Sequence, residues 1–120
     1  MTLAERCNAI EESYEFMLAY AAQGVADGTE IREYLTRAAT ALMELGQIAR
    51  QELDSPFVAV LDRDANDALA AVTLALAQPA ISSQLVDNLN ASIHLRALLT
   101  DLFLIDEVLK AQRDNQLAAS

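Results

Sequence analysis

The sequence contains little glycine and proline and no tryptophan, and these shortages limit what the chain can do. Only three glycines and two prolines occur in 120 residues. The glycine-rich loops that hold phosphate groups in Rossmann and P-loop proteins therefore have no counterpart here. The G-x-S-x-G and H-E-x-x-H patterns of hydrolases and metalloproteases are absent as well. We expect no catalytic residues, and an enzyme that works through unrecognised carboxylates ranks last among the functional hypotheses.

Cysteine is almost absent. Cys7 is the single thiol, so the chain can form neither an intramolecular disulfide nor a multi-cysteine metal site. Four glutamates occur in the first fifteen residues, a composition that signal and transit peptides avoid. The longest uncharged run, 68–86, contains Pro79 and polar residues at 82–84 and does not resemble a membrane span. We predict a cytoplasmic protein that does not enter a membrane.

Positive charge is scarce. Eight Lys and Arg oppose 18 Asp and Glu, which gives a formal net charge of −10. Binding to nucleic acid or to an anionic membrane surface relies on Lys and Arg, so we expect neither as a partner. Hydrophobic residues make up 53% of the chain, which is too many for a disordered protein. The length suits one hydrophobic core, and we predict a single domain over residues 1–120.

The hydrophobic pattern is helical along the whole chain. Four segments carry it: 2–23, 30–53, 56–78 and 82–113. Four helices joined by short loops predict an all-α, up-down-up-down four-helix bundle. The third helix has a candidate break at 62–66, the fourth has a candidate kink at 87–90, and residues 115–120 are expected to form a loose tail.

Helix-start signals support these boundaries. Thr2 and Glu5 have the spacing of a capping box, in which each side chain bonds the backbone amide of the other residue. The glycine-containing stretch 24–28 predicts a turn. Thr29 and Ser55 are the expected N-caps of the second and third helices.

The fourth segment is the most informative because its apolar residues are not confined to one stripe. A broad face holds Leu95, Leu98, Leu99, Leu102, Phe103, Ile105 and Leu109. Ile93, Ala97, Leu104 and Val108 cover much of the other side. A helix that is apolar nearly all round needs cover on both sides. Either the other three helices wrap it completely, or a second protein chain covers part of it, and we favour the second chain.

A second apolar patch is expected on the first segment. Phe16 and Tyr20 lie away from the stripe that faces the core, and aromatic residues are enriched at protein interfaces. The predicted partner interface therefore consists of Phe16, Tyr20, Ile93, Ala97, Leu104 and Val108.

His94, the only histidine, belongs to a predicted polar strip beside the core stripe of the fourth segment. On a helical wheel it lies near Asp87, Asn90 and Asp101. Such a strip is a candidate recognition patch or pH-sensitive contact. The simpler interpretation is a partly exposed histidine that is hydrogen-bonded to a neighbouring carboxylate or carbonyl, and we favour it.

His94 also enters two cofactor or catalytic alternatives. It could form a nucleophilic pair with Cys7, or bind a haem together with Met17 or Met43. Cysteine and methionine at helical spacing are more often core residues, so we expect neither.

Residues 62–67 begin like a calcium-binding loop. Asp67 stands where such a loop needs glycine, however, and Thr73 stands where it needs glutamate. Acidic residues that favour a helix N-terminus are the better explanation. We expect no metal and no cofactor.

These observations predict a non-enzymatic protein–protein interaction module. It would serve as an adaptor, a dedicated chaperone or a regulatory or assembly subunit, as a homodimer or with another protein, through an apolar face of the C-terminal helix. The alternative is a helical bundle that holds a small molecule or cofactor in an apolar internal pocket, with His94, Tyr14 or Tyr34 as the polar contact.

Overall fold

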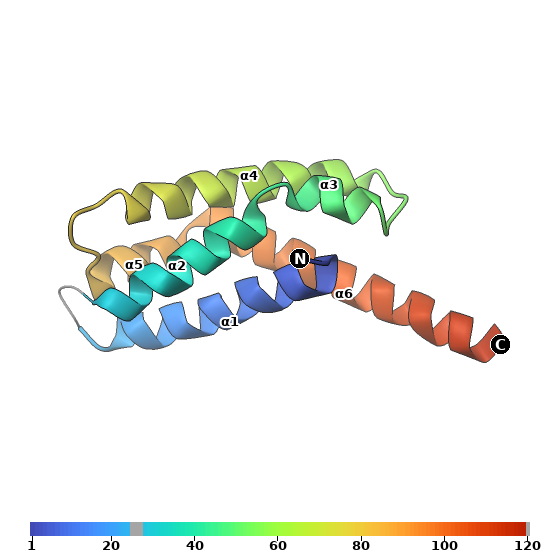
Figure 1. The fold of residues 1–120 in the computed structure, drawn as a ribbon, viewed down its shortest axis with the longest axis horizontal. Coiled ribbons are helices and arrows are strands. Elements are labelled where there is room, and N and C mark those ends of the chain that lie inside the picture. The colour runs from blue at the N-terminus through green and yellow to red at the C-terminus, as the bar shows by residue number, and fades with distance from the viewer. Residues whose placement is uncertain (25–27, 120) are drawn as a thin grey trace.

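The chain folds into helices. The computed structural model describes residues 1–24 and 28–119, and in these residues no strand occurs. The helices are α1 (Leu3–Ala22), α2 (Thr29–Leu42), α3 (Leu45–Arg50), α4 (Phe57–Leu76), α5 (Ser83–Ala91) and α6 (Ile93–Ala119). Helix α2 leads into α3 and α5 into α6, so the chain passes along the bundle four times (Figure 1). The predicted all-α helical bundle is confirmed, with two of the expected helices each divided in two.

Side-chain caps mark the starts of α1 and α5. At α1 the hydroxyl of Thr2 accepts from the amide of Glu5 at 3.1 Å, and the Glu5 carboxylate accepts from the amide of Thr2 at 3.2 Å. The predicted capping box is confirmed, and its hydrogen bonds hold the pKa of Glu5 below its usual range. Ser82 caps α5 by accepting from the amide of Leu85 at 3.1 Å.

The other expected caps differ in detail. Helix α2 begins at Thr29 itself, after an extended Gly28, so Thr29 does not act as the N-cap. Residues 25–27 of the predicted turn at 24–28 lie outside the described residues. Before α4, the hydroxyl of Ser55 accepts from the amide of Phe57 at 3.2 Å. Helix α4 then continues through 62–66 without the expected break.

The second expected helix, 30–53, is interrupted at Glu44. This residue has a φ of 60°, in the left-handed region, and separates α2 from α3. The guanidinium of Arg6, from α1, donates to the carbonyls of Thr40, Ala41 and Met43 at 3.3, 3.2 and 2.6 Å. These carbonyls are among those that the end of a helix leaves without an intrahelical partner. A side chain from another helix therefore stabilises the interruption.

The fourth expected helix is interrupted at Ser92, after the 87–90 stretch where a kink was expected. The backbone of Ser92 is extended, and its hydroxyl donates to the carbonyl of Leu89 at 2.7 Å and accepts from the amide of Leu95 at 3.3 Å. One serine thus ends α5 and begins α6. Residues 115–119, expected as a loose tail, continue α6 as helix.

Small residues and buried polar contacts hold the helices together. Gly46 of α3 lies so close to α4 that a Cβ atom on it would be 2.4 Å from the Cβ of Asp62. The amide of Asn90 in α5 donates to the carbonyl of Met17 in α1 at 3.1 Å. Arg32 of α2 donates to carbonyls at the C-terminal end of α4 and just beyond it, at 2.6 to 3.1 Å.

We predict that Gly46→Ala destabilises the protein by roughly 1–3 kcal/mol, the usual cost of overpacking a close contact. Urea unfolding followed by circular dichroism measures the change. Gln47→Ala, at the exposed neighbouring position, is the control and should change stability by less than about 0.5 kcal/mol. Equal stability of the Gly46→Ala variant and the parent would contradict the close packing of α3 on α4.

Candidate functional site

Helix α6 packs on the bundle through one stripe only. Leu95, Leu98, Leu102 and Ile105 are buried, and the helix lies against α4 and α5. Beyond Leu109 every described side chain is exposed. Figure 1 shows this end of α6, in red, projecting beyond the other helices. The projection is one reason why the molecule measures 53 Å along its long axis but only 23 Å across.

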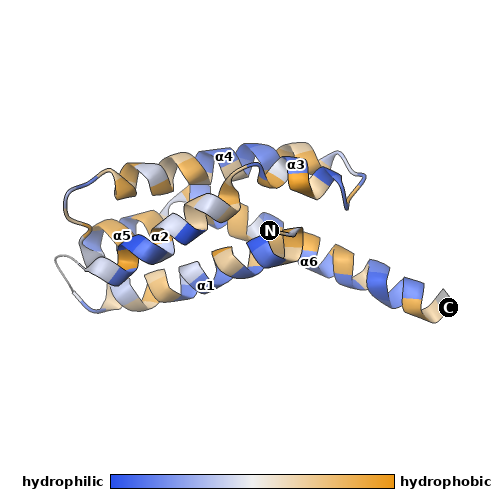
Figure 2. Ribbon diagram, in the orientation of Figure 1, coloured by the Kyte–Doolittle hydropathy of each residue, from blue (hydrophilic) through white to orange (hydrophobic). Residues whose placement is uncertain are grey.

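The opposite side of α6 carries a second apolar stripe with no cover. Ile93 is 72% exposed, Leu104 53% and Val108 45%, and Ala97 is partly exposed. At ~100° per residue these four positions fall within about 60° of one another, on the side facing away from the buried stripe. We call them the outer face of α6. Hydrophobic positions recur along the part of α6 that is visible in Figure 2.

Phe103 is placed differently from its expected position. The sequence pattern groups it with the core-facing residues, but its side chain is 58% exposed. On the helical wheel Phe103 lies at the edge of the core stripe. Phe103 lies about 80° from Ile93 on the wheel, with Arg96 and Glu107 between them, so it is not part of the outer face.

The expected patch at Phe16 and Tyr20 is not a free surface. Tyr20 is buried, and its hydroxyl donates to the carbonyl of Ile81. Phe16 is partly buried and stacks on Tyr34 of α2 with ring centroids 4.0 Å apart, and Arg37 lies over the Tyr34 ring. The helical wheel of α1 alone does not include these neighbours. Both residues belong to the packing within the chain and are removed from the candidate interface.

The predicted polar strip is also divided. Asp87 and His94 are exposed, whereas Asn90 and Asp101 are buried. The wheel assumed one continuous helix, but the interruption at Ser92 means that α5 and α6 do not share a helical register. The four residues therefore do not form a single recognition patch.

Two carboxyl pairs lie where α6 meets its neighbours. Burial raises the pKa of Asp101 to about 7, together with the hydrogen bond that its protonated carboxyl donates to Asp64 of α4 and the repulsion between the two charges. Burial and a similar interaction with Asp106 of α6 raise the pKa of Glu11 in α1. Like charges held close together favour the protonated form of one partner. We therefore expect the packing of α6 against α4 and α1 to depend on pH.

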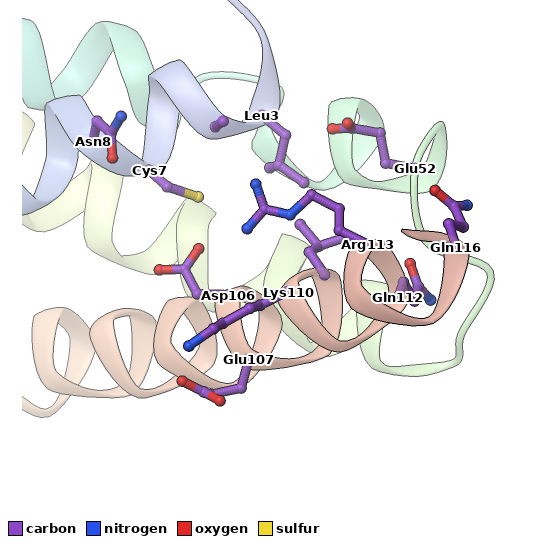
Figure 3. A pocket seen from close by; sticks show the side chains of 12 residues that line it. Leu3, Cys7, Asn8, Glu52, Asp106, Glu107, Lys110, Gln112, Arg113 and Gln116 are labelled. Atoms are coloured by element: carbon purple, nitrogen blue, oxygen red, sulfur yellow. The ribbon is translucent and has the colours of Figure 1, made fainter. Parts of the chain in front are cut away.

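A groove of about 600 Å³ separates the start of α1 from the projecting half of α6. Figure 3 shows Cys7 and Asp106 on facing walls, with Lys110 and Arg113 further along α6. Burial, reinforced by the charge of Asp106, raises the pKa of the Cys7 thiol to about 12. The thiol is therefore protonated at neutral pH and is a weak nucleophile.

The groove fits neither the cofactor alternative nor the catalytic one. His94 does not line it, so the structure does not place a Cys7–His94 pair there. Its mixture of charged and apolar side chains, open to solvent, also differs from the apolar internal pocket that ligand binding would use. The stretch 62–67, considered as a calcium loop, lies inside helix α4. The loop conformation that wraps calcium is therefore not formed by this stretch.

Comparison with known protein families, curated proteins and solved structures gives no match for this chain. No described helix is both long enough and apolar enough to cross a bilayer. Within residues 1–24 and 28–119, no group of three or more potential ligands from His, Cys, Asp and Glu is placed to hold a metal ion. The outer face of α6 is the surface from which a function can be argued.

We predict that the protein is more stable at pH 5 than at pH 8. The native state keeps the proton of Asp101 up to about pH 7, whereas the unfolded chain loses it near pH 3.8. The stabilisation is therefore complete below about pH 4 and is lost as the pH rises through about 7. Asp101→Asn mimics the protonated acid, so at pH 8 it should raise the free energy of unfolding by roughly 1–2 kcal/mol.

Urea titrations at several pH values test this prediction. Asp87→Asn, at an exposed carboxylate of α5, is the matched control and should keep the parent's pH dependence. If Asp101→Asn shows the same slope of stability against pH as the parent, the contact between Asp101 and Asp64 has been misjudged.

Proposed function

We propose that this protein is a non-enzymatic interaction module that binds another protein chain through the outer face of α6. Such a module acts as an adaptor, a dedicated chaperone or a regulatory or assembly subunit. The observation that carries the proposal is the exposure of Ile93, Leu104 and Val108 along one side of a helix whose other side is buried.

The pattern of the outer face is suited to helix recognition. Its residues are separated by four, seven and four positions, so they form a line along the helix. Partner proteins commonly engage a helix through apolar anchors at such spacings. Arg96, Thr100 and Glu107 lie close to this line and are exposed. An apolar centre with a polar border is the usual composition of a protein interface.

The exposed apolar residues of α4 do not form a comparable surface. Leu74 of α4 is 67% exposed and Val60 is 37% exposed. Both lie on the side of α4 that faces away from its buried stripe, but Arg63 and Asp67 interrupt that side. Single apolar side chains among charges are ordinary on a protein surface. This contrast favours α6 as the binding element.

We predict that a photo-crosslinking amino acid at position 104 forms a covalent adduct in cells of the native source. The same amino acid at position 74 is the matched control, because Leu74 is at least as exposed as Leu104. The adduct at position 104 should be a defined protein band, several-fold stronger than any band from position 74. Its mass shows whether the partner is a second copy or another protein.

A stability measurement accompanies the cross-linking. At concentrations where the protein is monomeric, Leu104→Glu should change the free energy of unfolding by less than about 1 kcal/mol, because the side chain then faces solvent. Cross-linking without preference between the two positions, or a large loss of stability in Leu104→Glu, would contradict the proposal.

A further inference from the structure

We infer that the outer face of α6 binds a second copy of this chain, with the two α6 helices packed antiparallel. The inference rests on the proposed function and names the partner. The inference is based on the side-chain sizes and charges along α6. In two antiparallel copies, large residues of one helix face small residues of the other, and positive charges face negative ones.

The sizes match in an antiparallel arrangement. Consider two α6 helices that cross between Asp101 and Leu102. Leu104 of each copy then lies over Ala97 and Thr100 of the other, so a large side chain enters a space left by small ones. Ile93 of each copy lies near Val108 of the other. The apolar line from position 93 to 108 is about 22 Å long, and in this arrangement each copy covers the other's line.

The charges match in the same arrangement. Arg96 and Glu107 are eleven residues apart, which places them within about 20° of each other on one flank of the outer face and about 16 Å apart along the axis. Two antiparallel helices related by a two-fold axis present the same flank to each other. Arg96 of each copy then faces Glu107 of the other, and the dimer contains this pair twice.

A parallel arrangement lacks this match. Its two-fold axis runs along the helices, so the two copies of this flank lie on opposite sides of the contact, and Arg96 of one copy cannot face Glu107 of the other. Both side chains are exposed, and neither forms an ion pair with another described residue of its own chain. They are therefore available for a second copy, and their order along α6 selects the antiparallel direction.

The net charge of −10 opposes the association of two identical chains, but the region of contact is balanced. Arg96 and Lys110 offset Glu107 and Asp114 along this flank. The remaining carboxylates lie mostly on other helices, and at physiological ionic strength charges further apart than about 8 Å are largely screened. The charges next to the outer face, rather than the net charge of the chain, therefore determine whether two copies associate.

Charge reversal tests this inference in purified protein. Sedimentation velocity across a wide concentration range should show a monomer–dimer equilibrium for the parent. Arg96→Glu alone and Glu107→Arg alone should each raise the dissociation constant about tenfold, because each replaces two attractive contacts by two repulsive ones. An equimolar mixture of the two variants should recover the parent's association, since every facing pair in the mixed dimer is again of opposite charge.

The control is Arg63→Glu, a charge reversal on the exposed side of α4, which should leave the dissociation constant unchanged within about twofold. Recovery in the mixture supports the antiparallel dimer, because parallel helices would not pair the variants in this way. A parent dimer that neither variant weakens overturns the arrangement. If the parent protein remains monomeric, the inference that the partner is a second copy of this chain is wrong. If position 104 nevertheless cross-links to another protein in cells, the proposed function stands without this inference, and if it cross-links to nothing, both fail.

Discussion

The structure depends on one constraint: α6 has apolar residues on two opposite sides, and the chain covers only one of them. Leu98, Leu102 and Ile105 hold the helix against the bundle. Turning α6 by half a turn would bury Leu104 and Val108 but expose the stripe that now forms the core. No rotation of this helix hides both stripes, so apolar surface remains exposed in the single chain. The proposal of a protein partner follows from this packing.

The two helix interruptions, at Ser92 and Glu44, determine which helices α6 packs against. Ser92 ends α5 and begins α6, so α5 packs against α1 while α6 packs against α4. Glu44 similarly separates α2 from α3, and Gly46 lets α3 lie directly on α4. With α4 held in this way, α6 is supported along its first half and leaves the bundle along its second. Because the pKa of Asp101 is raised at its contact with α4, we expect that support to weaken as the pH rises.

Much of this arrangement could be predicted from local sequence, and the misplaced features share one cause. The capping box at Thr2 depends on residues close together in the chain, and the outer face of α6 depends on helical spacing alone. The break at Glu44 depends on Arg6, 38 positions earlier, while the hydrophobic spacing continues across it. The hydroxyl of the buried Tyr20 donates to the carbonyl of Ile81, 61 positions later. Helical wheels drawn one segment at a time do not contain such contacts. For the same reason the helical wheel groups Phe103 with the core although its side chain is mostly exposed.

The most direct test of the central claim, that the outer face of α6 is a self-association surface, is the concentration dependence of backbone amide resonances in two-dimensional NMR. On dilution, we expect shifts at the outer face of α6 and at the neighbouring Arg96 and Glu107, and constant resonances at the exposed positions of α1 and α4. Shifts confined to α1 or α4, or a spectrum that does not change from micromolar to millimolar protein, would contradict the account.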